Sequence, residues 1–421
     1  MVMGNSILQK EVAQDHGTLV GENTVNLRES INRVIPGPPQ EIISGRRSFL
    51  IRLRIRARIV WIIFRNYRSI LLSVKILRSL LSFRHSALGE NKVMKYVHVD
   101  GKYFLGLYIP SFNSKAFEAF ILGEVNRIVP SGKQSNRFTS VLLSITKKCA
   151  LRCEHCSEWE TLNGNETLSL ADLKTIVTRF QQLGTSQFHF SGGEPLQRID
   201  DLLEVLKITD KRTECWVLTS GNNLTRENAQ RLKLTGLTGV VISIDHFDPD
   251  AHDRFRGSLK SFNWAVQAVR NAKEVNLITA ISICATKSFV SKSNLYAYAE
   301  MAKQLGVAYI QIFEPSAVGH YHDKDVELTN GKVKILEDFF LTMNHGKAFT
   351  EYPVVLYHGY YQRRIGCFSS ANRHVYVDSD GDIRDCPFCR AKAGNALNED
   401  IGRIVDQLRI TGCNKFKTIS V

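Results

Sequence analysis

Six short apolar runs, each separated from the next by a helical pattern, constrain the fold more than any other feature of the chain. Helical patterns between them carry start and stop signals, as in SLADLKTIVTRFQQLG (169–184), with Ser169 as N-cap and Gly184 at the end. Strands that are apolar throughout are typical of a parallel sheet covered on both faces. The pattern predicts an α/β fold with six strand–helix units joined by right-handed crossovers, fewer than a closed barrel needs, and hence a partial (β/α)6 TIM-like barrel. The six runs are SVLLSIT (140–146), FHF (188–190), CWVLTS (215–220), VVISID (240–245), LITAISI (277–283) and VAYIQIF (307–313).

Polar and cysteine residues follow the ends of these predicted strands. In parallel α/β folds the carboxyl ends of the strands form the ligand-binding face. We therefore expect these loops to meet at one site. The residues concerned are Cys149, Cys153 and Cys156 after the first strand, SGGEP (191–195) after the second, TSGN (219–222) after the third, Ser243 and Asp245 at the end of the fourth, and Glu314 and Gly319 after the sixth.

The stretch CALRCEHC places Cys149, Cys153 and Cys156 within eight residues. Thiolates are soft ligands that suit iron–sulfur clusters or zinc, but a structural zinc site takes four ligands, and His155 is poorly placed to be the fourth. A 4Fe–4S cluster held by three cysteines leaves one iron open. The chain has nine cysteines, and its start, MVMGNSILQKEVAQDHG, lacks the apolar core of a signal peptide. We therefore expect reduced thiols that are available for metal.

With C-x3-C-x2-C at the first strand end, GGEP at the second and the six-unit rhythm, residues 140–320 resemble the radical S-adenosylmethionine (radical SAM) superfamily. The resemblance implies that Cys149, Cys153 and Cys156 hold a 4Fe–4S cluster, whose open iron binds the amino and carboxylate groups of S-adenosylmethionine. It also implies reductive cleavage of this cofactor to a 5′-deoxyadenosyl radical, which abstracts hydrogen from the substrate. The cofactor then carries the difficult chemistry, and the protein orients it and excludes water.

The GGEP stretch is predicted to bind the cofactor. Gly192 and Gly193 permit close backbone approach, Glu194 is an acceptor for the methionine ammonium, and Pro195 stiffens the turn. The alternative is an ordinary Gly-Pro turn.

Three further residues are predicted around the cofactor, each with an alternative. Ser243 either donates to the carboxylate or ribose of the cofactor or caps the strand end. Relatives often have Ser-x-Asp-Gly here, whereas this chain has SIDHFD, so the role of Asp245 stays open. Arg256 either pairs with the cofactor carboxylate or is an ordinary surface arginine. His155 is either a flat neighbour of the adenine or solvated. No residue indicates a general base, so the catalytic residues are unknown.

Four cysteines follow the predicted barrel: Cys367, Cys386, Cys389 and Cys413. HVYVDSDGDIRDCPFC reads as a hairpin with Asp-Gly at its turn, and it resembles the SPASM/Twitch extension of radical enzymes. The resemblance implies one auxiliary 4Fe–4S cluster that is saturated by four thiolates and relays electrons. A four-cysteine zinc site is the alternative. We expect residues 326–421 to form a small α+β auxiliary-cluster domain, and Cys215 and Cys284 to be buried apolar residues.

The segments before the barrel carry most of the positive charge. Net charge is +14, and Arg46 to Arg84 contain eleven Arg/Lys without Asp or Glu, so the remainder carries +3. We expect residues 1–45 to be a disordered tail and 46–90 a basic amphipathic helical segment, although IRLRIRARI also alternates like a strand. This segment lies either on an anionic membrane surface or on the protein body with a solvated basic face, and its uncharged runs are too short to span a bilayer. A nucleic-acid arm is disfavoured. Residues 91–135 read as a hairpin at Asp100-Gly101 and a helix from Ser114, which caps the barrel floor or holds substrate.

These patterns predict a radical SAM enzyme with its core at residues 136–325, acting on a peptide or other bulky substrate. We expect an electron donor such as flavodoxin or ferredoxin. We expect a cytoplasmic location, and peripheral attachment to the inner face of the membrane if the basic segment binds lipid. One alternative is a membrane-associated lipid or lipid-linked substrate. Another is a non-catalytic iron–sulfur or zinc-binding interaction protein, against which GGEP argues, because a structural metal does not need it.

Overall fold

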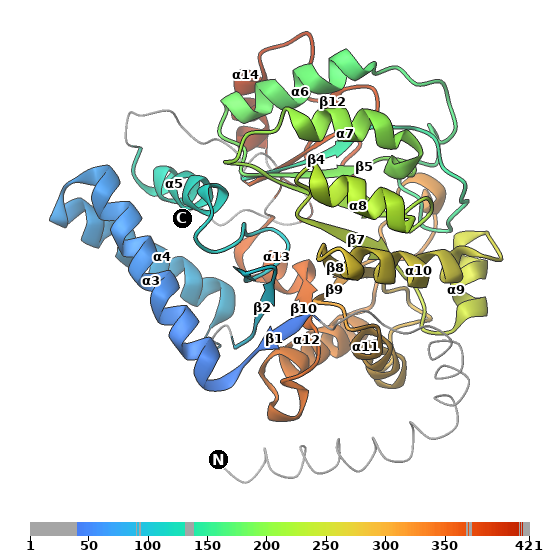
Figure 1. Ribbon diagram of the computed structural model, residues 1–421, viewed down its shortest axis with the longest axis horizontal. Coiled ribbons are helices and arrows are strands. Elements are labelled where there is room, and N and C mark those ends of the chain that lie inside the picture. Colours follow the sequence, from blue (N-terminus) through green and yellow to red (C-terminus); the bar gives the residue numbers. More distant parts are fainter. Residues whose placement is uncertain are drawn as a thin grey trace.

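The computed structural model describes residues 40–89, 91, 94–130, 139–367, 369, 373–411, 413 and 415. Helices and strands alternate through most of this length (Figure 1). The strands are β1 (Glu41–Ile43), β2 (Tyr96–Val99), β3 (Lys102–Phe104), β4 (Ser140–Ser144), β5 (Gln187–Ser191), β6 (Glu214–Thr219), β7 (Gly239–Ser243), β8 (Ile278–Cys284), β9 (Tyr309–Phe313), β10 (Val354–Tyr357), β11 (His374–Val377), β12 (Asp382–Arg384) and β13 (Gly394–Asn395). The α-helices are α3 (Gly45–Tyr67), α4 (Ile70–Leu88), α5 (Lys115–Ile128), α6 (Leu170–Gln182), α7 (Ile199–Lys207), α8 (Arg226–Leu234), α9 (Pro249–Arg256), α10 (Ser261–Glu274), α11 (Lys292–Leu305), α12 (Asn330–His345), α13 (His358–Ile365) and α14 (Ile401–Thr411).

The central sheet has the order β10-β9-β8-β7-β6-β5-β4-β11-β12-β13. Strands β4 to β9 are parallel neighbours in chain order, which confirms the six-unit α/β prediction. The sequence did not predict that β10 extends the sheet parallel to β9 and β11 parallel to β4. Both come from residues after 325, so part of the range assigned to the auxiliary domain builds the sheet of the core. Whether the rest of 326–421 is a separate domain stays a prediction.

The outward faces of the strands form the main hydrophobic core. Val141, Phe188, Val217, Ile242 and Ile310 are completely buried in the core cluster to which the helices around the sheet also contribute (Figure 1). Local signals fix these helices: Ser169 is the N-cap of α6, as predicted, and it forms a capping box with Asp172. In the barrel, the helices therefore cover the outer face of the sheet, and the inner face of the sheet lines the interior.

A hairpin closes the bottom of the barrel. β2 and β3 pair around Asp100 and Gly101, which have φ of 52° and 72°, as a two-residue turn of this type requires. Side chains of the hairpin, such as Val97 and Phe104, pack with the inward-facing Trp216. The predicted hairpin is confirmed, and it forms part of the barrel floor. Strand β1 pairs with β2, so the predicted tail 1–45 is wrong in its last residues; residues 1–39 lie outside the described residues.

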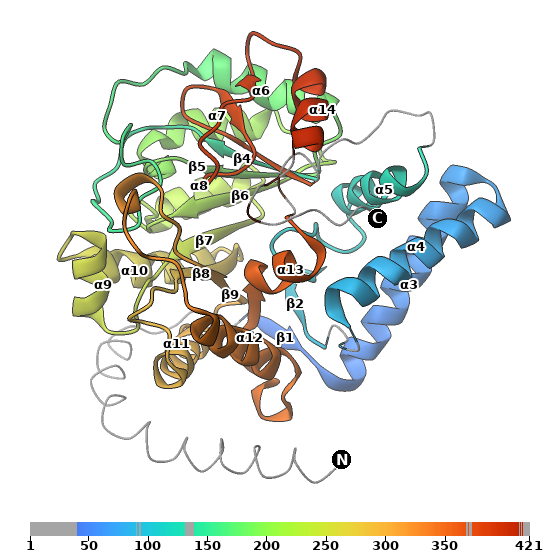
Figure 2. The same cartoon turned by 180° about the vertical axis from the view of Figure 1, so that it is seen from behind.

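The basic segment forms two helices rather than one continuous helix. Arg68, with φ of 50°, ends α3, and Ser69 caps α4 through the Leu72 amide. The helices contact each other and α5, and they lie along one edge of the molecule (Figures 1 and 2). The helical prediction is confirmed, and the strand alternative for IRLRIRARI is wrong. No helix in the described ranges is both long and apolar enough to cross a membrane.

Candidate functional site

The cysteine loop follows β4 and is held by backbone contacts with two distant segments. The amides of Arg152 and Glu154 donate to the carbonyls of Arg256 (3.2 Å) and Phe255 (3.0 Å), at the end of α9. The amide of His320, beyond β9, donates to the carbonyl of Cys156 at 2.9 Å. The loop therefore does not depend on its own sequence alone, because α9 and the segment after β9 fix its course.

Gly319 contacts this loop so closely that no other residue fits. A Cβ at Gly319 would lie 2.1 Å from the carbonyl oxygen of Cys156, and its φ of 57° also favours glycine. The sequence placed Gly319 at the predicted site only through its position after the sixth strand. Asn163 was missed altogether: its Oδ1 accepts from the amide of Cys149 at 3.0 Å.

The three thiols lie in surroundings that disfavour the thiolate in the absence of a cation. Cys153 is buried, and Cys149 and Cys156 are half-buried. Burial raises the pKa of Cys149 to about 11 and that of Cys156 to about 12. Within the described ranges, no group of three or more His, Cys, Asp or Glu side chains surrounds a point that one metal ion could occupy. This donor set fits an iron–sulfur cluster, which needs thiolates and takes each on a different iron.

A buried ion pair lies directly beside the cysteine loop. Nε and Nη2 of Arg256 both donate to Oδ2 of Asp245 at 2.5 Å, and Nη1 lies 3.5 Å from Sγ of Cys153. Burial favours the neutral acid, but the charge of Arg256 outweighs it and lowers the pKa of Asp245. The view of Arg256 as an ordinary surface residue is therefore wrong, and Asp245, whose role the sequence left open, is its partner.

The GGEP turn packs against the backbone that leads into the cysteine loop. The amides of Gly193 and Glu194 donate to the carbonyls of Thr146 (2.8 Å) and Lys148 (2.7 Å). A Cβ at Gly192 or Gly193 would lie 2.5 Å or 2.4 Å from these same carbonyl oxygens. The glycines thus allow close approach to the chain itself; approach to a cofactor stays a prediction. Pro195 begins a short 3-10 helix, for which Glu194 is the N-cap.

Glu194 is saturated by donors from its own chain. Its carboxylate accepts from the amides of Leu196 and Ser220 and from the hydroxyls of Thr219 and Ser220. Burial raises its pKa despite these bonds. Because a carboxylate offers about four acceptor sites, Glu194 holds the TSGN loop in place here. Its role as acceptor for an ammonium group stays a prediction.

Ser243 and His155 occupy different surroundings. Ser243 is half-buried at the end of β7, and the Ser282 hydroxyl lies 3.4 Å from its own. His155 stacks on Phe255 with ring centroids 4.9 Å apart, and burial lowers its pKa to about 4. His155 is therefore a neutral packed ring rather than a solvated one.

Comparison with known families shows the kind of domain in which these residues lie. The model of the radical SAM superfamily matches residues 143–287, which include the cysteine loop, GGEP, Asp245 and Arg256. The chain carries a radical SAM domain. Proteins with this domain are enzymes that use a 4Fe–4S cluster and S-adenosylmethionine, as the sequence predicted.

The relatives of the radical SAM domain act on different substrates. The chain is 24% identical over 292 residues to AdoMet-dependent heme synthase of Methanosarcina barkeri, covering 63% of this chain and 81% of that protein. It is 32% identical over 140 residues to PqqA peptide cyclase of Bradyrhizobium diazoefficiens, covering 33% of this chain and 37% of that protein. Among the first curated relatives, several are spanned by the chain over less than half of their length. The crystal structure of Streptococcus suis SuiB bound to precursor peptide SuiA is 14% identical, covers 81% of this chain and 79% of that chain, and has a TM-score of 0.54, which shows a shared fold.

The four cysteines after the radical SAM domain come together. Sγ of Cys386 lies 3.4 Å from Sγ of Cys389, and the sulfur of Cys413 contacts those of Cys367 and Cys389. The predicted β11–β12 hairpin that precedes Cys386 is confirmed, with Gly381 at its turn at φ of 79°. Cys215 is buried in the main core, as predicted, and Cys284 is buried at the end of β8.

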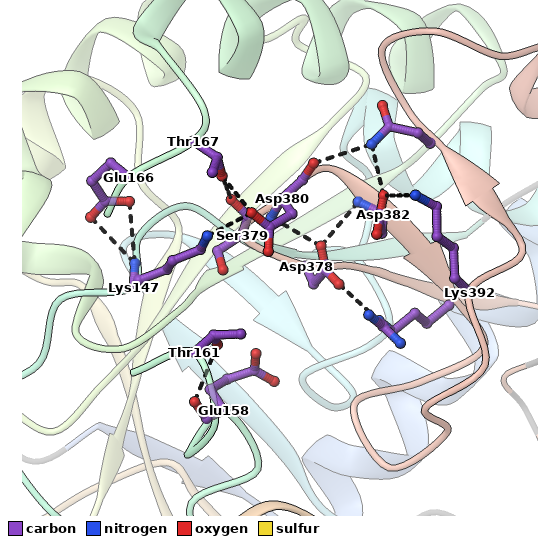
Figure 3. Close-up of polar contacts among 12 residues, drawn as sticks. Lys147, Glu158, Thr161, Glu166, Thr167, Asp378, Ser379, Asp380, Asp382 and Lys392 are labelled. Atoms are coloured by element: carbon purple, nitrogen blue, oxygen red, sulfur yellow. Dashed lines mark hydrogen bonds and ion pairs between the residues drawn. The ribbon is translucent and has the colours of Figure 1, made fainter. Parts of the chain in front are cut away.

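A polar network joins this hairpin to the radical SAM domain (Figure 3). Lys147, just before the cysteine loop, forms an ion pair with Asp380 at 2.6 Å, and the Thr167 hydroxyl donates to the same carboxylate at 2.7 Å. Asp378 then accepts from the amides of Asp380 and Asp382, 3.0 Å each. The sequence did not predict this connection, which fixes the strand pair before Cys386 to the base of the cysteine loop.

Proposed function

We propose that this chain is a radical SAM enzyme in which Cys149, Cys153 and Cys156 bind the 4Fe–4S cluster. The observation that carries the proposal is the three-cysteine loop within the matched domain, held at the strand ends by α9 and Gly319. With S-adenosylmethionine bound, such a cluster supplies by one-electron reduction a 5′-deoxyadenosyl radical able to abstract hydrogen from carbon.

The residues around the loop position and tune this site. Arg256 places a positive charge beside the sulfur of Cys153 while Asp245 keeps it in place. Glu194 holds the TSGN loop in place. Gly192 and Gly193 allow the GGEP turn to pack closely on the backbone of Thr146 and Lys148. Ser243, half-buried at the same edge of the sheet, is proposed to donate to the cofactor. These contacts hold the site rigidly before the cofactor binds, which lowers the cost of orienting it.

The second cysteine group is proposed to hold one auxiliary 4Fe–4S cluster, with Cys367, Cys386, Cys389 and Cys413 as ligands. Four thiolates saturate a cluster, so electron relay from a donor such as flavodoxin or ferredoxin is the role that fits. The four sulfurs lie close together, and the iron–sulfur chemistry of the adjoining radical SAM domain favours a cluster over zinc.

A peptide is the substrate class that we propose for the radical chemistry. Support comes from two similar proteins, one named as a peptide cyclase and one solved with its precursor peptide. The proposal is tested by adding peptides encoded beside the gene of this chain and following their mass by mass spectrometry. Release of 5′-deoxyadenosine without any mass change in these peptides would reject it.

Release of 5′-deoxyadenosine tests the radical chemistry itself. The full chain, loaded anaerobically with iron and sulfide, should release it from S-adenosylmethionine when dithionite is added. The variant with Cys149, Cys153 and Cys156 all replaced by Ala should release none, whereas Cys215→Ala should behave like the wild type. Equal release from the triple variant, or none from the wild type, would refute the proposal.

The structure also favours binding of α3 and α4 to an anionic membrane surface. Of the seventeen large apolar side chains that are well exposed in the described residues, eleven lie on these two helices, with Ile70 and Leu71 72% and 85% exposed. At 3.6 residues per turn, those of α3 share roughly a third of its circumference, opposite the buried face. They are Phe49, Leu50, Leu53, Val60, Trp61 and Phe64.

Charge supports an anionic membrane as the partner that we propose for this apolar surface. The segment has eleven basic residues and no acidic one. Among the described residues, Arg47 forms an ion pair with Glu41, and Arg58 and Arg65 form ion pairs with Glu118. An apolar stripe flanked by arginine is the pattern of a helix that lies in the interface of an anionic bilayer. The enzyme would then be cytoplasmic and peripheral, with a peptide or lipid-linked substrate close to the membrane.

Co-sedimentation with vesicles tests the membrane proposal. The full chain should bind vesicles of mixed phosphatidylglycerol and phosphatidylcholine. It should bind vesicles of phosphatidylcholine alone much more weakly. Ile70→Ser with Leu71→Ser, and Lys75→Glu with Arg78→Glu, should each weaken binding severalfold. Leu234→Ser with Leu259→Ser, which are exposed elsewhere, serve as the matched control. Binding that ignores lipid charge or these helices would instead point to another partner and reject the proposal.

A further inference from the structure

The interior of the barrel keeps accessible surface above its hairpin floor. Along β4, β6 and β10 the inward-facing residues Leu142, Leu218 and Leu356 are half-buried, whereas their outward neighbours, such as Val217 and Val355, are completely buried. Side chains in the middle of strands remain accessible only where they border a space. The inner side of this sheet is therefore not filled like a core, and its walls at this level are apolar.

A layer of neutral polar rings and amides lies between these walls and the floor. Tyr108, from the segment after β3, stacks on His189 with ring centroids 4.8 Å apart and meets His358 and His374 edge-on at 4.8 Å and 5.1 Å. Its hydroxyl accepts a bond from the amide of Gln311 at 2.7 Å. Five side chains from the floor segment, β5, β9, α13 and β11 thus form one group.

Several polar atoms of this inner face have no partner in the described part of the chain. They include both ring nitrogens of His189 and Oε1 of Gln311, together with Nε1 of Trp216, the hydroxyl of Tyr309 and Oε1 of Gln187. Buried polar atoms are nearly always hydrogen-bonded, and several such orphans on one inner surface indicate a bound group or water. Tyr108, His358 and His374 keep accessible surface, as residues that line an internal space do, whereas His189 and Gln311 are at most 1% exposed and lie behind them.

The layer carries no net charge. Burial lowers the pKa of His189 to about 3 and that of His358 to about 4, and it lowers the pKa of His374 well below its usual range. None of the recorded polar contacts that join the five side chains involves Asp, Glu, Lys or Arg. The arginines whose charges act on His374 are Arg373 and Arg127, and both form ion pairs with Glu124. A charged group would therefore be buried here without a counter-charge, which costs several kcal/mol.

The layer lies directly below the cofactor site in the same barrel. His189 is two residues before Ser191 on β5, which leads into GGEP, and Gln311 is two residues before Phe313 at the end of β9. A substrate that enters between the strand ends would reach this layer with its inner end. The apolar walls and a few neutral polar groups correspond to the usual composition of a ligand pocket.

We propose that Tyr108, His189, Gln311, His358 and His374 form the inner end of the substrate pocket and select an uncharged hydrogen-bonding group, such as an amide or a phenol, on an apolar stem. This inference rests on the proposed function, because it names the substrate chemistry of the same barrel. Selection follows from the neutral, accessible side chains of Tyr108, His358 and His374, which can hydrogen-bond to a neutral polar group but give an ionised group no counter-charge; Gln311 holds the Tyr108 hydroxyl in place behind them.

Matched small probes test this pocket. Isovaleramide, isovalerate and isoamylammonium share one apolar stem and differ in charge. By ligand-detected NMR titration of the full chain, reconstituted anaerobically with its cluster, isovaleramide should bind roughly tenfold more tightly than either ion, since one unsatisfied buried group corresponds to about that factor. Gln311→Leu and Tyr108→Phe should each remove most of this preference.

Tyr103→Phe is the matched control, because Tyr103 lies on β3 of the same hairpin and packs in a different cluster, towards α3 and α5. Equal binding of amide and ions, no binding of the amide, or an unchanged preference in Gln311→Leu and Tyr108→Phe would overturn the proposal. Release of 5′-deoxyadenosine, measured on the same preparations, separates the two claims. Release without amide binding rejects only the pocket, and amide selection without release supports the pocket while rejecting the proposed radical chemistry.

Discussion

Arg256 reaches the sulfur of Cys153, with Nη1 3.5 Å from Sγ, while its other two nitrogens hold Asp245. The second oxygen of Asp245 accepts from the amide of Cys284 at 2.9 Å, at the end of β8. Burial alone would lower the pKa of Arg256, but Asp245 and Cys153 raise it, so the guanidinium keeps its charge. One buried ion pair therefore connects α9, two strand ends and the cysteine loop.

Breaking this pair should destabilise the metal-free protein strongly. Arg256→Met leaves Asp245 buried without its counter-charge, and we expect unfolding to become easier by about 3–5 kcal/mol. The double variant Arg256→Met, Asp245→Asn should recover much of this loss, because both charges are gone. Urea denaturation measures each value, and Arg254→Met, an exposed position on the same helix, is the control. A loss no larger than that of Arg254→Met would contradict the role given to the pair.

Iron content separates a cluster from zinc at the second cysteine group. The anaerobically reconstituted chain should hold about eight irons, corresponding to two 4Fe–4S clusters. Cys386→Ala with Cys389→Ala should reduce this to about four, with 5′-deoxyadenosine release in dithionite retained, because the radical SAM domain is intact. Four irons plus bound zinc in the unaltered chain would show that the four cysteines hold zinc instead.

Gly319 offers a test of the contact that supports the cysteine loop. In Gly319→Ala the new Cβ would meet the carbonyl oxygen of Cys156 at 2.1 Å, and alanine would also be strained at φ of 57°. We expect a stability loss of about 2–4 kcal/mol, from overpacking and the left-handed backbone together, and impaired loading of iron. Gly331→Ala, on α12 with open space around the glycine, should load iron normally. Normal loading by both variants would mean that the loop moves freely.

The sequence predicted those features that are carried by local patterns. Strand β4 and the N-cap at Ser169 follow from alternation of apolar runs with helix signals, and the match to the radical SAM superfamily covers CALRCEHC and GGEP, on which the predicted cofactor site rests. Helix α4 could not be separated from α3, because the break at Arg68 and Ser69 contains neither Gly nor Pro. Strand β10 was missed because VVLY is a four-residue apolar run, and its pairing with β9 depends on a crossover through α12.

Contacts between distant segments could not be predicted from the sequence, for a physical reason. Nothing near Arg256 in the sequence distinguishes a buried arginine from a surface one; only the packing of α9 on the cysteine loop buries it. The layer around Tyr108 joins residues from positions 108 to 374, each an ordinary residue in its own segment. The alternation FHF in β5 predicted that His189 lies on a strand. It gave no indication that His189 stacks on Tyr108, which comes from the hairpin floor of the barrel.

The buried histidines make stability depend on pH in a defined direction. Burial lowers the pKa of His189 to about 3 and that of His252 to about 4, whereas an unfolded chain binds the proton at about 6.5. Below about 6.5 the unfolded state takes up protons that the folded state does not, so stability should fall as the pH decreases towards the folded values. Each such histidine contributes a slope of about 1.4 kcal/mol per pH unit in this window. His189→Phe should reduce the slope of the metal-free protein, measured by urea denaturation between pH values in this window, by one such share. His322→Gln, at a largely exposed position, is the control. Parallel curves for the wild type and His189→Phe would mean that His189 is protonated in the folded protein, which would also give the inner layer of the barrel a charge.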